Sequence, residues 1–146
     1  MSFAMNGKDK ILQVGIDSNI FIYHFERNEH FSLFTDKVFA QINQAKIHPF
    51  TSVISVTEAL SYPAPQTVLD GILFGFTTLK NLRLVEVNLA ISLEAARIRR
   101  TYGFRLPDSL HLATSLVGKV DYFLTNDSRL TSFKELEVKM LNDIAK

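Results

Sequence analysis

The sequence predicts an α/β fold in which a central, mostly parallel sheet is covered by helices on both faces. Short apolar runs typical of buried strands alternate with segments of helical spacing along the whole chain. The chain has 146 residues, the usual size of one domain, and 47% of them are hydrophobic against 21% charged, which is a globular composition. We therefore expect a flexible N-terminal extension over residues 1–10 and a single domain over residues 11–146.

The N-terminal half contains two predicted strands, each followed by two helices. In the order strand, helix, helix, strand, helix and helix, the segments are 11–16, 18–28, 31–46, 47–52, 52–60 and 67–80. Pro49 weakens the prediction of the second strand, because proline removes a hydrogen bond from a sheet ladder. Gly71 and Gly75 are unfavourable inside the last of these helices and would mark close packing against a neighbour.

The C-terminal half continues the alternation. In the order strand, helix, helix, strand and strand, the predicted segments are 82–87, 89–103, 107–118, 120–125 and 138–141, with a turn and a short helix after the fourth strand of the chain. Asn88 is the expected N-cap of the first of these helices, and Gly103 is expected at its C-terminus. Pro107 is expected to open the next helix, since proline suits the first helical position.

Composition limits the classes of function. The chain has no cysteine, which excludes disulfides, thiolate metal sites and cysteine nucleophiles and is consistent with a reducing compartment. A formal net charge of +1 argues neither for nor against nucleic acid, because a local basic patch can lie within a neutral total. No apolar run approaches the roughly 18 residues that span a bilayer. We expect a cytoplasmic protein without a membrane segment.

Four acids lie at or near the edge of the predicted sheet where the sites of α/β folds form, beyond the carboxyl ends of the strands. Two of them follow strands, one lies on the helix after the second strand, and one lies in the first turn of the helix that Pro107 opens. They are Asp17, Asp127, Glu58 and Asp108, respectively.

Each acid also has a purely structural explanation. Asp17 would cap the helix that follows it, and Asp127 would be a turn residue. Asp108 would gain about 0.3–1 kcal/mol from the dipole of its helix. Glu58 would ordinarily be solvated, although its apolar neighbours in VISVTEALSY favour an interaction with a partner.

Taken together, the four acids indicate a metal site. Carboxylates that converge in one crevice repel one another, so either some take up protons or a divalent cation holds them together. Oxygen ligands without cysteine favour a hard ion, Mg²⁺ or Mn²⁺. Such ions can make water nucleophilic toward a phosphodiester and stabilise the leaving oxygen, with no serine or cysteine nucleophile.

Four motifs carry a resemblance to a known family. GIDSNIFIYHFE, TSVISVTEALSY, RLPDSLHLATSL and DYFLTNDSRL resemble, in order and rough spacing, the motifs of PIN-domain ribonucleases, and single-domain VapC-type toxins are the most similar members. The resemblance implies a three-layer α/β/α sandwich (PIN-like), metal-dependent RNA cleavage and an acidic quartet at Asp17, Glu58, Asp108 and Asp127. It also implies that Asn19, Thr125 and Asn126 shape the site, and that the chain forms a homodimer inhibited by a VapB-type antitoxin.

The chain departs from the family pattern near Asp127. Many members carry a further acid shortly after the TND motif, whereas Ser128, Arg129 and Leu130 stand here. His111 is common at its position in part of the family without being a defining ligand. We interpret it as a helix residue close to the site.

The most basic segment, RIRRTYGFR, leads directly into the helix that bears Asp108. Its arginines (Arg97, Arg99, Arg100 and Arg105) are candidates for contacts with RNA phosphates. Tyr102 or Phe104 would stack on a base. The alternative is an exposed, solvated helix end, because cations also suit a helix C-terminus.

Three hypotheses for function follow. The first is an Mg²⁺- or Mn²⁺-dependent endoribonuclease, the toxin of a toxin–antitoxin pair. The second is a non-catalytic PIN-like RNA-binding or scaffold module, which would gain nothing from four mutually repelling acids. The third is a phosphoryl-transfer enzyme or receiver domain of another α/β family. It is disfavoured, because an aspartyl-phosphate phosphatase would carry a second Asp where Asn19 stands.

Overall fold

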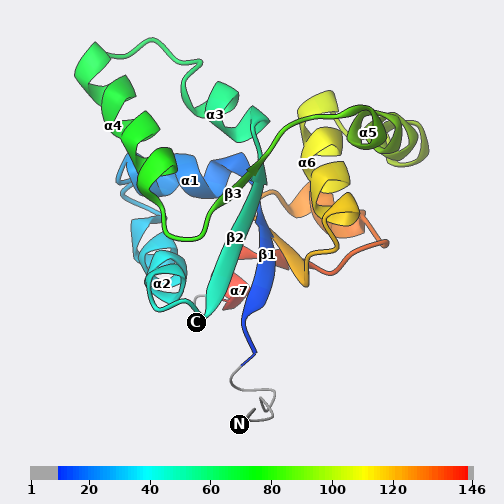
Figure 1. Ribbon diagram of the computed structural model, residues 1–146, viewed down its shortest axis with the longest axis horizontal. Helices are drawn as coiled ribbons and strands as arrows, with labels where there is room; N and C mark the ends of the chain where they lie inside the picture. Colours follow the sequence, from blue (N-terminus) through cyan, green and yellow to red (C-terminus); the bar gives the residue numbers. More distant parts are fainter. Residues whose placement is uncertain (1–9, 145–146) are drawn as a thin grey trace, which may run out of the picture.

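The computed structural model describes residues 10–144, and its five strands form a single sheet in which all neighbours are parallel. The strand order is β3-β2-β1-β4-β5 (Figure 1). The strands are β1 (Leu12–Ile16), β2 (Ile47–Ser52), β3 (Arg83–Val85), β4 (Tyr122–Thr125) and β5 (Val138–Met140). The helices are α1 (Ser18–Phe25), α2 (Ser32–Asn43), α3 (Ile54–Ala59), α4 (Gln66–Thr78), α5 (Leu89–Tyr102), α6 (Leu106–Val117) and α7 (Leu141–Ile144), with a 3-10 helix η1 (Ser128–Ser132).

Helices cover both faces of the sheet, as Figure 1 shows for α1, α2 and α4 on one side and for α5 and α6 on the other. Two separate clusters of buried apolar residues lie in these two layers. Alternate residues of one strand supply both clusters: Tyr122 and Leu124 of β4 face the first, and Phe123 faces the second. The predicted three-layer α/β/α sandwich is therefore confirmed.

Several local predictions need correction. β3 has only three residues, and a last short helix, α7, was not predicted. Pro49 lies inside β2 but before the part of β2 that pairs with β3, which starts at Phe50. At Pro49 only one neighbouring strand is paired, so the missing N–H costs the sheet little. A Cβ on Gly75 would lie 2.7 Å from Phe25, whereas nothing lies within 4 Å of Gly71, so the prediction of close packing is wrong for Gly71.

The strand order places a switch point beside β1. The chain passes from β1 to β2 and β3 on one side, and β4 then pairs with the other edge of β1. The backbone N–H of Asp17, just past the end of β1, donates to the carbonyl of Leu124 in β4 at 2.9 Å. The carboxyl ends of β1 and β4 are thus held together, at the position where open α/β sheets bind ligands.

Gly15 allows helix α6 to lie directly on β1. A Cβ on this glycine would lie 2.0 Å from Ser115 Oγ and 3.0 Å from Ser115 Cβ. The absence of a side chain therefore sets the distance between the strand that leads to Asp17 and the helix that carries Asp108.

Both predicted caps of α5 are present. Asn88 Oδ1 accepts a hydrogen bond from the N–H of Ile91, and Gly103, at the C-terminal end, has a φ of 76°.

The predicted extension over residues 1–10 lies outside the described residues except for Lys10, whose Nζ lies 3.3 Å from Asp121 Oδ1. Within residues 10–144, no helix is both long and apolar enough to cross a membrane.

We expect Gly15→Ala to lower the free energy of unfolding by about 1–3 kcal/mol, because the new methyl group overpacks the contact between β1 and α6. Gly71→Ala is the matched control. It should leave stability unchanged or raise it by up to about 1 kcal/mol, since alanine favours a helix and the site is open. Urea unfolding of both variants measures the difference. Equal stabilities would show that the close approach at Gly15 is not a constraint.

Candidate active site

Asp17 is the central acid of the site and is almost fully buried, with 4% of its surface exposed. Asp17 follows β1 and is the N-cap of α1, so the helix-cap role predicted for this residue is confirmed. Its Oδ1 accepts from the N–H of Ser18 at 2.8 Å, and its Oδ2 accepts from Thr125 Oγ1 at 2.7 Å. A cap alone does not need the second bond, which fixes the carboxylate against the end of β4.

Thr125 also positions Asp127. While its hydroxyl donates to Asp17, the same oxygen accepts from the backbone N–H of Asp127 at 3.0 Å. Asp127 in turn caps η1 by accepting from the N–H of Arg129 at 3.0 Å. The end of β4 therefore holds two acids through one hydroxyl, which accounts for a site-shaping role of Thr125.

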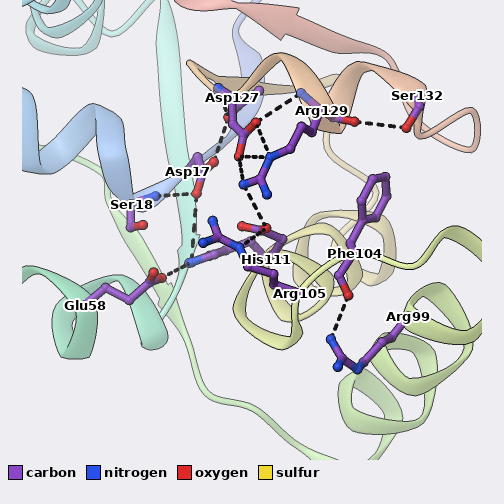
Figure 2. Close-up of polar contacts among 12 residues, drawn as sticks. Asp17, Ser18, Glu58, Arg99, Phe104, Arg105, His111, Asp127, Arg129 and Ser132 are labelled. Atoms are coloured by element: carbon purple, nitrogen blue, oxygen red, sulfur yellow. Dashed lines mark hydrogen bonds and ion pairs between the residues drawn. The ribbon is translucent and has the colours of Figure 1, made fainter.

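Asp108 reaches the site from helix α6, which begins at Leu106, one residue earlier than predicted. The residue is 8% exposed. Its Oδ2 accepts from Arg105 Nε at 3.2 Å and lies 3.8 Å from Arg129 Nη2. Arg129 also binds both carboxylate oxygens of Asp127 through its Nε, at 3.0 and 3.2 Å (Figure 2). Two arginines thus neutralise two of the acids.

Glu58 and His111 form the other side of the site (Figure 2). His111 Nε2 lies 2.5 Å from Glu58 Oε1 and 4.0 Å from Asp17 Oδ1, and the histidine is 2% exposed. The imidazole is therefore the partner that the apolar surroundings of Glu58 required. His111 joins helix α3 to the end of β1 and lies nearer to the acids than its sequence position alone could show.

The pKa shifts reflect a buried cluster of like charges. Burial raises the pKa of Asp17 most strongly, and the charges of Asp108 and Glu58 raise it further, against the opposing effects of His111 and Thr125. Burial by itself lowers the pKa of His111, but its bond to Glu58 and the surrounding carboxylates outweigh this effect, so the net shift is upward.

The pKa values of Glu58 and Asp127 shift the other way. Burial raises the pKa of Glu58, but the hydrogen bond and charge of His111 dominate and leave it lowered. The hydrogen bonds from Arg129 are the main cause of the lowered pKa of Asp127. Glu58 and Asp127 are therefore ionised at neutral pH.

The four acids supply carboxylate oxygens, which are the ligands that a hard divalent cation prefers. Burial raises the pKa of Asp17, so a cation beside it would stabilise its ionised form. As the side chains lie, however, no three acids or histidines in residues 10–144 converge closely enough to form a metal site. The guanidinium group of Arg129 lies between Asp127 and Asp108 instead. A cation would bind these two acids only after the arginine had moved.

Other predicted residues lie at varying distances from this cluster. Asn19, on α1, is half-buried, and its Oδ1 has no hydrogen-bond partner among the described residues. Asn126 is half-buried in the bend between Thr125 and Asp127. The sequence did not predict that Arg129 contacts the acids. Arg105 was predicted to bind RNA, and its hydrogen bond to Asp108 was not predicted.

The basic segment is only partly available for RNA. Arg97 lies 2.5 Å from Glu94 and 2.8 Å from Glu135, and Arg99 donates to the carbonyl of Phe104 at 2.8 Å. Arg100 is exposed. Phe104 packs in the core, so the prediction that it stacks on a base is wrong.

The chain belongs to the PIN domain family, whose sequence profile matches residues 14–137. PIN domains are nucleases and generally use divalent metal ions. Two solved structures share the fold. A chain of a toxin–antitoxin complex from Klebsiella pneumoniae has a TM-score of 0.66 at 15% identity, over 88% of this chain and 97% of that chain. A chain of VapBC2 from Rickettsia felis, bound to a DNA fragment from its promoter, has a TM-score of 0.70 at 13% identity, over 88% and 98%. No curated protein matches the chain in sequence.

We expect Glu58→Gln to lower the pKa of His111, because the burial that opposes protonation would then lack its strongest counterweight. The imidazole Cε1–H resonance of His111, followed by NMR in chelator-treated protein, measures the midpoint. Glu26→Gln, on an exposed residue that follows α1, is the control and should leave the midpoint unchanged.

Stability should follow the same shift. A raised folded pKa of His111 stabilises the chain fully below its unfolded value, roughly pH 6.5, and this stabilisation is lost as the pH rises through the folded pKa. The stability difference between the wild type and Glu58→Gln should therefore grow as the pH falls from about 8 to about 6. A difference that shrinks over this interval would contradict the assigned pair.

Proposed function

We propose that the chain is an endoribonuclease that depends on Mg²⁺ or Mn²⁺ and hydrolyses RNA phosphodiester bonds. The observation that carries this proposal is the gathering of four acids beyond the carboxyl ends of β1 and β4. Thr125 contacts both Asp17 and Asp127, Arg129 contacts both Asp127 and Asp108, and His111 lies between Asp17 and Glu58. Two like-charged groups in a buried position destabilise the fold unless a cation offsets them. Membership in a nuclease family supports the same conclusion.

The proposed role of each residue follows from its position in the site. Asp17 and Asp108 are the proposed principal metal ligands, and Glu58 and Asp127 complete the acidic quartet. A bound divalent cation supplies a water of lowered pKa and offsets charge on the phosphodiester. Thr125 orients Asp17 through its hydroxyl, and His111 holds Glu58. Asn19 and Asn126 line the same edge of the sheet as site-shaping residues.

RNA would approach along the start of α6. Arg105, at the N-terminus of this helix, and Arg100, exposed on α5, are the proposed phosphate contacts. Arg97 is less suitable, because Glu94 and Glu135 already neutralise its charge. The hydroxyl of Tyr102 donates to Glu135 at 2.9 Å, while its ring stacks on Phe104.

We further propose that the chain is the toxin of a toxin–antitoxin pair and acts on cytoplasmic RNA. Its fold is shared with chains of two toxin–antitoxin complexes. Helix α4 exposes the large apolar side chains of Val68, Leu73 and Phe74 at 45, 44 and 68%, and coverage of such side chains would favour association with a VapB-type antitoxin. The mass of the chain in solution, alone and with such an antitoxin, tests the association.

One observation favours a second candidate function, a non-catalytic RNA-binding or scaffold module. Arg129 and Arg105 already neutralise Asp127 and Asp108, so the chain can fold without a metal ion. In such a module, replacing an acid would leave RNA affinity unchanged or raise it, and no cleavage would be lost.

We expect metal-stripped protein to cleave total RNA when Mg²⁺ or Mn²⁺ is added, and not in the presence of a chelator. Asp108→Asn should lower the cleavage rate by at least roughly 100-fold, because it weakens a direct metal contact. Asp70→Asn, which removes an exposed carboxylate from α4, is the matched control and should cleave like the wild type. Induced expression should arrest growth with the wild type and not with Asp108→Asn.

Two outcomes would contradict the proposal. Cleavage that persists undiminished in Asp108→Asn would mean that this acid is not part of the active site. Folded protein that binds RNA and yet cleaves none of the pool with either metal would favour the non-catalytic module.

A further inference from the structure

Arg129 occupies an unusual position for a surface arginine. It lies on η1, directly after the end of β4, and its side chain turns back over the acids (Figure 2). Three of its contacts with Asp127 are hydrogen bonds of Nε or Nη2 to the two carboxylate oxygens, and its Nη2 also lies 3.8 Å from Asp108 Oδ2. One guanidinium group thus bridges two acids that belong to different secondary-structure elements.

The charges show what this bridge does. Asp17, Asp108 and Asp127 contribute three negative charges when ionised, and Asp17 has no arginine among its described ion-pair partners. Arg105 and Arg129 offset the two acids at the open side of the site, where Asp108 and Asp127 have side-chain exposures of 11 and 19%. Without these guanidinium groups, the carboxylates of Asp127, the N-cap of η1, and of Asp108, on α6, would lie near one another with little counter-charge.

We propose that Arg129 is a built-in counter-ion that competes with the divalent cation for Asp127 and Asp108, and so sets the metal affinity of the site. This inference rests on the proposed function, since it takes these acids as metal ligands. Arg129 acts through the acids and is therefore a positioning residue. The metal-free chain is stabilised by the arginine, and the metal-bound chain requires the arginine to leave.

The surroundings of Arg129 permit this exchange. Its side chain is 57% exposed, so it can swing into solvent without opening the core. The next residue, Leu130, is fully buried and anchors η1 independently of the arginine. Arg129 can therefore move while the backbone that carries Asp127 stays in place. The exchange replaces one cation by another and keeps the acids compensated in both states.

The test measures Mn²⁺ binding and does not depend on RNA cleavage. Electron paramagnetic resonance of free Mn²⁺ gives the dissociation constant for the wild type and for Arg129→Ala at low ionic strength. We expect Arg129→Ala to bind Mn²⁺ about fivefold more tightly, because the ion no longer displaces a partly exposed ion pair. Arg129→Lys, which keeps the charge and loses the bidentate fork, should fall between the two. Arg27→Ala removes an exposed arginine that pairs with Asp36 after the end of α1, and it should bind like the wild type.

Thermal unfolding supplies a second readout. Without metal, Arg129→Ala should have a lower Tm than the wild type, because Asp127 loses its arginine partner and Asp108 keeps only Arg105. With saturating Mn²⁺ the two Tm values should converge, since the arginine is displaced in the wild type as well. A purely structural arginine would lower the Tm equally in both conditions.

The possible results separate this inference from the proposed function. Equal or weaker Mn²⁺ binding by Arg129→Ala, with tight binding by the wild type, would overturn the role of Arg129 and leave the metal site standing. A Tm deficit that persists unchanged in Mn²⁺ would overturn it too. Absence of Mn²⁺ binding by both proteins would overturn the proposed metal site and this inference together.

Discussion

The bond from Thr125 Oγ1 to Asp17 Oδ2, at 2.7 Å, joins the two central strands at the point where the site forms. It depends on the strand order, which places the end of β4 beside the end of β1. Gly15 completes the arrangement, because a side chain there would keep α6, and with it Asp108, away from β1. A backbone topology, one hydroxyl and one missing side chain therefore determine where the acids meet.

The same arrangement brings several carboxylates together, and they repel one another. Different side chains interact with them on the buried side and on the open side of the site. On the buried side, His111 lies between Glu58 and Asp17. Burial lowers the pKa of its imidazole, but the hydrogen bond to Glu58 and the surrounding carboxylates raise it overall. On the open side, Arg129 bridges Asp127 and Asp108. His111 is confined by packing, whereas the side chain of Arg129 is 57% exposed and has room to move. A divalent ion and a phosphate chain would enter from the open side.

The fold could be predicted from the sequence because its strands are short, apolar and regularly alternated with helices. Asp17, Glu58, Asp108 and Asp127 could be proposed as a set because three of them follow or begin secondary-structure elements and the fourth, Glu58, has apolar neighbours. The roles of His111 and Arg129 could not, since each depends on which side chains from distant segments meet. Arg129 follows Asp127 by two residues, yet its contact with Asp108 crosses from η1 to α6. Phe104 was misassigned because an aromatic residue among arginines resembles a stacking platform whether or not it is buried.

The most direct test of the metal centre is a crystal structure of the chain grown or soaked with Mn²⁺, with anomalous diffraction used to locate the ion. The predicted result is an anomalous peak bounded by the carboxylates of Asp17 and Asp108, with the guanidinium group of Arg129 withdrawn from Asp127. An ion bound elsewhere, or an acid cluster that remains bridged by Arg129 at saturating Mn²⁺, would contradict the assignment of these acids as the metal-dependent active site.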